Sequence, residues 1–447
     1  MPTRARRRAD RTEQAIEAAL QPGRFISYGA AWSFIEGLES VGGEIAVLVR
    51  SSPSRAVTLY ETFLAGCYEK ANELDDSSGS FGSFVAGLFR AWATARQAAG
   101  ADPDDTARRL LAWMDDDPYG FCYHLERELV KALDRAGLVA FERCVRARLA
   151  GTGAGPDGQQ TQDPGFARRR WAEALRTILA ARRDVEAYVR LCEETELTPE
   201  DTLVIARMLQ TRRKPADALA WVERGLALAT RARTSLANHD LGRLRRELLQ
   251  KLGRGGAALA AAWAEFEEHP HRYSYEELMR YAPEPERTAW HTKAMEAAAK
   301  ADLYSQVDLW LATGERDRLV ARLRSASHEE LEGTSHHATE PAAKALAETH
   351  PDVAAKLYRA LGLRILVAKK SRYYDAALSH LEEARRCYER AGLLTEWETI
   401  VRAVRADHRR KVGFMAGFED IVAGGGPSTK PSFLERAKAR WARPPGA

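Results

Sequence analysis

The sequence lacks the patterns that mark zinc, disulfide and membrane proteins. Its 447 residues include only five cysteines, and none lies in the close C-x-x-C spacing that zinc sites and disulfide frameworks show. They are Cys67, Cys122, Cys144, Cys192 and Cys387. We therefore expect reduced, buried thiols and residence in the cytoplasm.

Two further absences narrow the class of protein. No run of about 18 apolar residues occurs, so no membrane span is expected. The N-terminal segment MPTRARRRADRTEQ carries charge without the apolar stretch of a secretory signal. The formal net charge is only +4, which is small for a protein that holds nucleic acid over its whole surface.

Catalytic motifs are missing as well. The sequence has no G-x-S-x-G, no H-E-x-x-H and no G-x-G-x-x-G behind a strand pattern. Helical proteins can be enzymes, so the question stays open. The sequence nevertheless favours a protein without catalytic activity, and we expect no cofactor.

Helical periodicity, in contrast, runs through almost every segment. Segment 373–392, YYDAALSHLEEARRCYERAG, has an inner stripe formed by Ala377, Leu381, Ala384 and Tyr388. Such stripes ordinarily pack on neighbouring helices of the same chain, and we expect that here.

The same period decides the ambiguous segments. In residues 120–137, apolar side chains recur every four positions, and Gly137 is predicted to end that helix. The best strand candidates, residues 44–49 and 361–369, fit buried helices equally well. We therefore predict an all-α fold.

The C-terminal region shows a loose internal repeat. Residues 203–228 read as a helix, a turn with Pro215 and a second helix, and residues 245–266 repeat this design. Six positions of the first pair resemble the packing residues of a tetratricopeptide repeat (TPR): Ile205, Ala206, Leu209, Ala218, Val222 and Gly225. A single helix pair cannot bury its own apolar face, so we predict an irregular TPR-like α-solenoid of stacked helix hairpins, preceded by an N-terminal helical lobe.

Composition shifts suggest five parts of the chain. Residues 1–12 are predicted to be a basic disordered arm, and residues 13–150 the helical lobe. Residues 151–165, rich in Gly and polar residues, are predicted to be a flexible linker. The TPR-like domain then covers residues 166–422. A Gly/Pro linker with a short amphipathic tail forms residues 423–447.

Two acidic loops are the best candidates for a metal site. They are ELDDSSGSFGSF, residues 73–84, and WMDDDPYG, residues 113–120. If the loops meet, a cation could be held by the carboxylates of Asp75 and Asp76 together with those of Asp115, Asp116 and Asp117. The spacing fits no EF-hand and no phosphate loop, so capping of helix ends is the favoured interpretation.

Several segments resemble a known family. YETFLAGCYEKANELDDSSGSFGSF, AWMDDDPYGFCYHLERELVKALDRAGL and RADHRRKVGFM are similar to an uncharacterised bacterial all-helical family, domain-of-unknown-function family six-eight-eight-zero. The C-terminal half also resembles the helical region that follows the zinc-binding domain of SWIM zinc-finger proteins. The C-x-C and C-x-H signature of that domain is absent, so zinc binding is not implied. The resemblance implies helical repeats and no particular activity.

We hypothesise a non-enzymatic scaffold that binds a protein or peptide along a concave surface. Expected contact residues are Arg207, Gln210, Arg245 and Trp310. One alternative is a nucleic-acid-associated protein that uses the N-terminal arginines and basic helix faces. A weaker alternative is a metal- or phosphate-dependent activity at the acidic loops. The sequence specifies neither the partner nor the oligomeric state.

Overall fold

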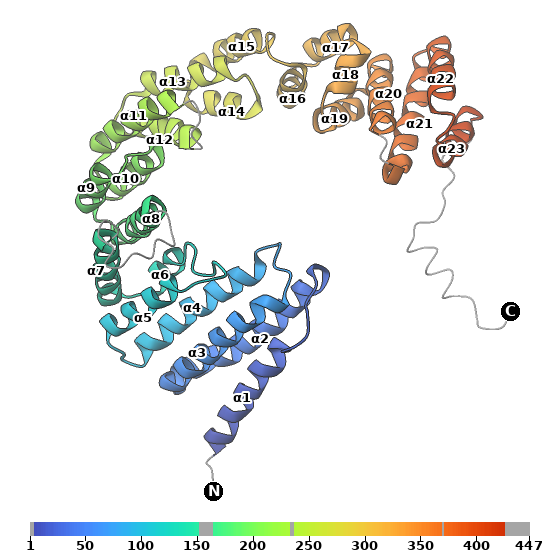
Figure 1. Ribbon diagram of the computed structural model, residues 1–447. Helices are drawn as coiled ribbons and strands as arrows, with labels where there is room; N and C mark the ends of the chain where they lie inside the picture. The colour runs from blue at the N-terminus through green and yellow to red at the C-terminus, as the bar shows by residue number, and fades with distance from the viewer. Residues whose placement is uncertain (1–3, 152–163, 233–236, 369–370, 425–447) are drawn as a thin grey trace, which may run out of the picture. The chain divides into compact units, whose positions relative to one another are not determined.

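The computed structural model describes the backbone of residues 4–151, 164–232, 237–368 and 371–424 (Figure 1). Within these ranges it describes the side chains from residue 11 on, except those of residues 164, 231 and 232. The described residues form α-helices, three short 3-10 helices and no strand, so the predicted all-α class is confirmed. One isolated bridge joins Ile26 to Leu74. No described helix combines the length and apolar character that crossing a bilayer requires.

The chain forms two compact units, Met1–Leu248 and Leu249–Ala447. The helices of the first unit are α1 (Arg4–Leu20), α2 (Tyr28–Ser51), α3 (Pro53–Lys70), η1 (Ala71–Glu73), α4 (Ser80–Ala98), α5 (Pro103–Asp115), α6 (Glu126–Ala132), α7 (Arg135–Gly151), α8 (Pro164–Arg182), α9 (Val185–Glu194), α10 (Pro199–Thr211) and α11 (Pro215–Ala232). Helix α12 (Ala237–Lys251) contains the division between the units.

The helices of the second unit are α13 (Gly255–Glu268), α14 (Arg272–Tyr281), η2 (Glu284–Glu286), α15 (Arg287–Ala298), α16 (Leu303–Thr313), α17 (Arg316–Ser325), α18 (His328–Gly333), α19 (His336–Leu346), α20 (Pro351–Val367), η3 (Ser371–Tyr373), α21 (Tyr374–Arg390), α22 (Leu394–His408) and α23 (Val412–Val422). Both segments that also read as strands are helical, since residues 44–49 belong to α2 and residues 361–367 to α20.

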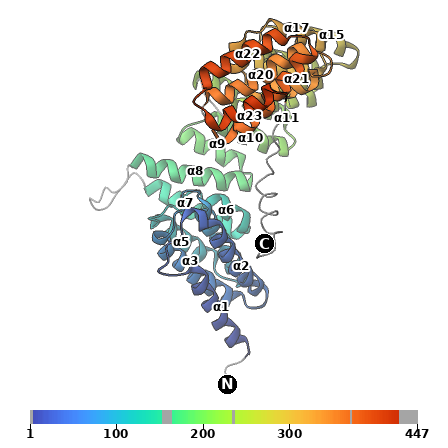
Figure 2. The same ribbon diagram turned by 90° about the vertical axis from the view of Figure 1, so that its right-hand side faces the viewer.

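Helix α3 is the centre of the N-terminal lobe. It packs against α1, α2 and α4, and Figure 2 shows α1, α2 and α3 together from the side. Its inner stripe, which includes Leu59, Phe63 and Cys67, is fully buried, because apolar residues at helical spacing face all three neighbours.

The division of the chain differs from the prediction. Residues 4–12, predicted to be a disordered arm, belong to helix α1. Residues 152–163 of the predicted linker lie outside the described residues, but the helices on both sides of it pack together, because α8 contacts α6 and α7. The linker therefore separates no compact units, and the division lies after Leu248 instead. Residues 425–447, most of the predicted tail, also lie outside the described residues.

The predicted end of the helix at Gly137 is wrong. Helix α6 stops at Ala132, and Gly137 lies in the first turn of α7. The Asp134 carboxylate accepts a hydrogen bond from the Gly137 N–H at 2.7 Å, so this segment begins a helix. A side chain at position 137 would also crowd Leu133, since a Cβ there would lie 3.1 Å from its Cδ2.

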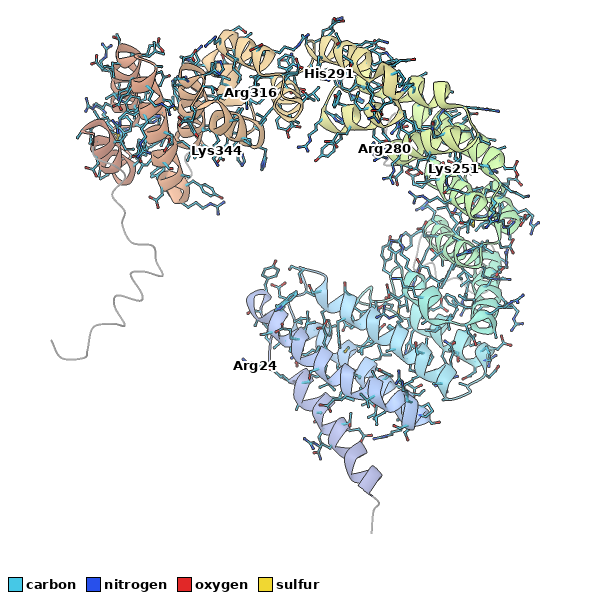
Figure 3. All side chains as sticks on the ribbon, turned by 180° about the vertical axis from the view of Figure 1, so that it is seen from behind. Arg24, Lys251, Arg280, His291, Arg316 and Lys344 are labelled. Atoms are coloured by element: carbon cyan, nitrogen blue, oxygen red, sulfur yellow. The ribbon has the colours of Figure 1, made fainter. Side chains whose placement is uncertain are left out.

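In the second unit, α20 and α21 pack closely together. The predicted inner stripe of α21, residues Ala377, Leu381, Ala384 and Tyr388, is at most 1% exposed, and packing within the chain is thereby confirmed. A polar contact chain also joins three segments of this unit: His291, labelled in Figure 3, lies 2.8 Å from the Tyr275 hydroxyl and 3.0 Å from a Glu315 carboxylate oxygen.

Candidate functional site

The two acidic loops lie next to each other in the N-terminal lobe, and each contacts a residue that flanks the other. The rings of Phe81 and Phe121 lie edge to face with their centroids 5.6 Å apart. Asn72 Nδ2 donates a hydrogen bond to the Tyr119 hydroxyl at 2.6 Å. The first condition for a shared cation site is therefore present, and the question becomes what the carboxylates already contact.

The first loop uses its carboxylates to hold its own backbone. Asp76 accepts hydrogen bonds from the N–H groups of Phe81 and Gly82, both at 2.9 Å, and thus satisfies the free donors at the start of α4. Asp75 accepts from the Ser77 hydroxyl and N–H, and these bonds lower the pKa of Asp75. Both side chains have capping and turn roles.

The second loop behaves in the same way through Asp117. Asp117 accepts from the Phe121 N–H at 3.1 Å and from the Cys122 N–H at 2.6 Å. Asp115 pairs with Arg148, and Asp116 is exposed to solvent. Among the described residues, no three His, Cys, Asp or Glu side chains gather in a way that could hold a metal ion.

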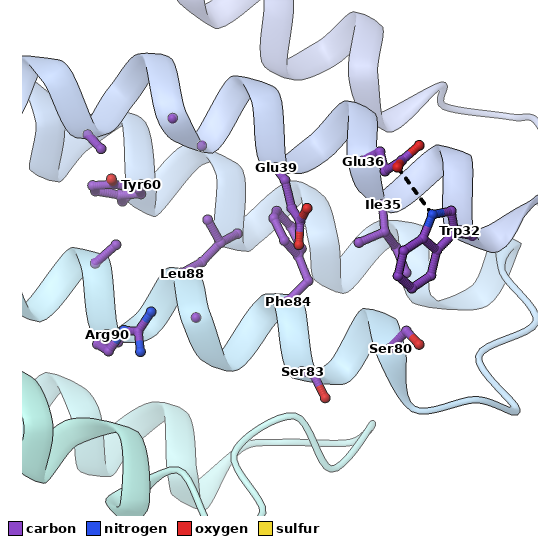
Figure 4. A pocket seen from close by; sticks show the side chains of 15 residues that line it. Trp32, Ile35, Glu36, Glu39, Tyr60, Ser80, Ser83, Phe84, Leu88 and Arg90 are labelled. Carbon is purple, nitrogen blue, oxygen red and sulfur yellow. Dashed lines mark hydrogen bonds between the residues drawn. The ribbon is translucent and has the colours of Figure 1, made fainter.

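A more open feature lies beside these loops, between helices α2 and α4. We call it the α2–α4 groove (Figure 4). It encloses about 580 Å³, and its lining residues are Trp32, Ile35, Glu36, Glu39, Gly42, Gly43, Ala46, Tyr60, Ser80, Ser83, Phe84, Gly87, Leu88, Arg90 and Ala91. Ile35, Tyr60 and Leu88 are buried and form an apolar floor.

The walls of the groove are made of very small residues. At Gly43 and Gly87, an added Cβ would meet no atom within 4 Å, so packing inside the described chain does not require glycine there. Neither glycine has a left-handed backbone that only glycine adopts easily. Glycine in a helix nevertheless costs roughly 1 kcal/mol relative to alanine.

Helix α2 presents an apolar seam along the mouth of the groove. Tyr28, Trp32, Ile35, Glu39, Gly43 and Ala46 follow one another at the three- and four-residue spacing of one helix face, with Glu39 as its one charged member. Trp32 is 72% exposed, and its indole N–H donates to Glu36 at 3.1 Å. A single exposed apolar residue is ordinary on a protein surface. An exposed tryptophan that continues into an open apolar groove is typical of a binding surface.

The rim of the groove is acidic on its α2 side. Glu36 and Glu39 both line it, and within the described part of the chain Glu39 has no ion-pair partner. On the α4 side, Arg90 is already paired with Glu128 at 2.9 Å. The negative charge of α2 is therefore the uncompensated charge of this surface.

Comparison with known proteins places the chain in a family. Residues 10–416 match the family described as "Family of unknown function (DUF6880)". The chain belongs to this family. The matched span contains the whole α2–α4 groove of this DUF6880 protein. No curated protein matches the chain.

The predicted contact residues of this DUF6880 protein do not form one site. Trp310 is only 4% exposed and belongs to the core of the second unit, so its prediction as a surface contact is wrong. Its apolar ring lies on the same helix stripe as other core residues, which explains the burial. Arg207 pairs with Asp240 at 2.9 Å, Arg245 lies 4.0 Å from Glu223, and Gln210 is half-buried.

Some basic residues on the helix faces pair with acidic neighbours. Arg280 and Lys344, labelled in Figure 3, pair with Glu277 and Glu340 on their own helices at 2.7 Å. Side chains of the N-terminal arginine cluster lie outside the described residues. The described surface thus offers no specific observation in favour of nucleic-acid binding.

Sequence reasoning missed the groove because its signal is an unusual one. Helix α2 holds four glycines in 24 residues, together with Trp32. Such glycines read as helix breakers or as noise in the period. Whether such a glycine lines an open groove depends on how far the neighbouring helices lie from it, and the sequence of one helix does not contain that distance.

Proposed function

We propose that this DUF6880 protein binds another protein by receiving a helical segment of that partner in the α2–α4 groove. The observation that carries the proposal is the pair of groove glycines with open space beside them. They weaken two helices without relieving any contact in the described chain. Close approach of a partner backbone supplies a reason for them.

The seam on α2 favours a helical occupant. It runs from Tyr28 to Ala46, which corresponds to roughly 27 Å of helix axis. A partner helix docks through side chains at the same three- and four-residue spacing, with Trp32 as the main anchor.

The charge of the rim indicates the chemistry of that helix. Basic side chains beside its apolar stripe would face Glu36 and Glu39, which favours association with the correct partner. A second copy of α2 is a poor occupant, because antiparallel pairing about the middle of the seam would bring Glu36 and Glu39 of both copies together. We propose a cytoplasmic partner, since the predicted reduced state of the cysteines fits that compartment.

The test compares two leucine substitutions on one helix. Gly43→Leu fills the groove, whereas Gly37→Leu adds the same side chain at an exposed position of α2 that does not line it. Neither new Cβ meets an atom within 4 Å. Tagged wild type and both variants are used to capture proteins from the native host, with quantification by mass spectrometry and equal folding checked by circular dichroism.

We expect one set of captured proteins to be lost with Gly43→Leu and kept with Gly37→Leu. A purified partner from this set should bind more weakly to Glu39→Lys than to wild type. Equal capture by all three proteins contradicts the proposal. Light scattering that shows a wild-type dimer lost only in Gly43→Leu would identify a second copy as the occupant instead.

A further inference from the structure

A second groove lies in the other unit, between helices α20 and α22, and we call it the α20–α22 groove. It encloses about 560 Å³. Its apolar lining comes from Leu363 and Val367 on α20 and from Ile400, Ala403 and Val404 on α22. Val367 is 66% exposed, so the apolar surface continues to the rim.

Acidic side chains mark the two ends of this groove on α22. Glu396 lies near its start and Asp407 near its end, and both line the groove. Within the described residues, neither carboxylate forms an ion pair or a side-chain hydrogen bond. They lie eleven positions apart in α22, which corresponds to about 16 Å and three turns, so both lie on one face.

The other charged groups of the groove do not offset these carboxylates. Arg359 is half-buried and is paired with Glu332 at 3.3 Å, and because both side chains line the groove, this pair adds no net charge to it. Burial lowers the pKa of His328 and of His408, which favours the neutral form of both imidazoles. The groove therefore has an apolar centre between two negative ends.

We infer that the α20–α22 groove binds an amphipathic helix of a partner protein that carries one basic residue at each end of a three-turn apolar stripe. The apolar lining residues recur along both walls at helical spacing, which fits a third helix laid between α20 and α22. Basic residues eleven positions apart lie on one face of that helix at the separation of Glu396 and Asp407. The spacing of the charges gives selectivity, because a helix with the same charges on its other face cannot pair with both ends.

This inference does not depend on the proposed function, because the α2–α4 groove belongs to the other unit. One site can fail while the other stands. The two sites would give the protein two separate contacts for partner helices.

Three synthetic peptides provide the test, each a fluorescein-labelled helix of about 15 residues built on alanine and glutamine with a leucine stripe. The first carries lysines at each end of the stripe, eleven positions apart. The second carries the same two lysines on the opposite face. The third carries glutamates in place of the lysines. Binding to the full chain is followed by fluorescence anisotropy at low salt.

The wild-type chain should bind the first peptide at least fivefold more tightly than the second or third. The double variant Glu396→Gln with Asp407→Asn should lose roughly five- to twentyfold in affinity for the first peptide, because each partly exposed charge pair contributes a factor of about two to five. Glu398→Gln is the matched control, since Glu398 is exposed on the same helix and does not line the groove.

Three results would overturn the inference. They are equal affinity for the first and second peptides, unchanged affinity of the double variant, and no binding of the first peptide at millimolar concentration. All substitutions lie on the surface, so a melting curve that superimposes on that of the wild type confirms that the fold is intact.

Discussion

Two glycines of the first unit should respond oppositely to the same substitution by alanine. At Gly87 on α4, an added methyl group meets no atom within 4 Å. Alanine then contributes its better helix propensity, and we expect the free energy of unfolding to rise by roughly 0.5–1 kcal/mol. At Gly225 on α11, the added Cβ would overlap Thr202 Oγ1 and lie 3.0 Å from Leu241 Cδ1.

The overlap at Gly225 is difficult to relieve. Thr202 is fully buried, and its hydroxyl donates to the Pro199 carbonyl at 2.7 Å, so the side chain is held in place. Overpacking costs about 1–3 kcal/mol, which outweighs the propensity gain of about 1 kcal/mol. We expect Gly225→Ala to lower the free energy of unfolding by about 1 kcal/mol or more.

Thermal unfolding monitored by circular dichroism at 222 nm measures both effects. For a unit of 248 residues, a change of 1 kcal/mol shifts Tm by roughly 2–4 °C. Gly87→Ala should therefore melt higher and Gly225→Ala lower than wild type. Adding Thr202→Ala to Gly225→Ala should cost less than the sum of the two single changes, because the overlapping atom is gone. A drop in Tm for Gly87→Ala would refute the claim that space beside it is open.

Other perturbations test the loops and the thiols. Asp76→Ala removes both hydrogen-bond acceptors at the start of α4 and should lower the free energy of unfolding by about 1–2 kcal/mol in urea titrations, whereas a loss near zero would contradict its capping role. Lys70→Met leaves Glu73 and two backbone carbonyls without their buried donor and should cost about 2–3 kcal/mol in the same assay, so an unchanged midpoint would count against this contact. In the native protein at pH 8, iodoacetamide should label Cys144 first, because it is half-exposed, while burial raises the pKa of the Cys122 thiol to about 12. Peptide mapping that finds Cys122 labelled first would show that this core opens readily.

The sequence was sufficient for the fold class because helical period is a local property. The apolar stripe of α21 could be recognised directly from the spacing of its residues. Residues 44–49 could be assigned to a helix because the helical spacing of apolar residues continues through them. Gly137 was misread, since a glycine after an apolar run looks the same whether it ends one helix or follows the cap of the next. Only the bond from its N–H to Asp134 distinguishes the two cases.

The candidate site was harder to predict for a different reason. Capping by Asp76 could be expected from residue type alone, whereas contact between the two acidic loops depends on how α3 and α4 pack. Trp310 and Trp32 are equally apolar in the sequence. Trp310 is buried and Trp32 is exposed, because neighbouring helices cover the face of the helix that carries Trp310 and leave open the face that carries Trp32. The sequence of one helix does not show which of its faces will be covered.

The close packing around α21 constrains how related sequences can diverge. A Cβ at Gly362 of α20 would lie 2.7 Å from Leu381, and a Cβ at Gly417 of α23 would lie 2.6 Å from Leu378. Each glycine and leucine therefore form a matched pair, in which a larger residue on one helix demands a smaller one on the other. Across homologues, positions 362 and 381 should therefore covary, as should positions 417 and 378. Where both glycines are kept, α20 and α23 can approach α21 as closely as they do here, with leucine at positions 381 and 378.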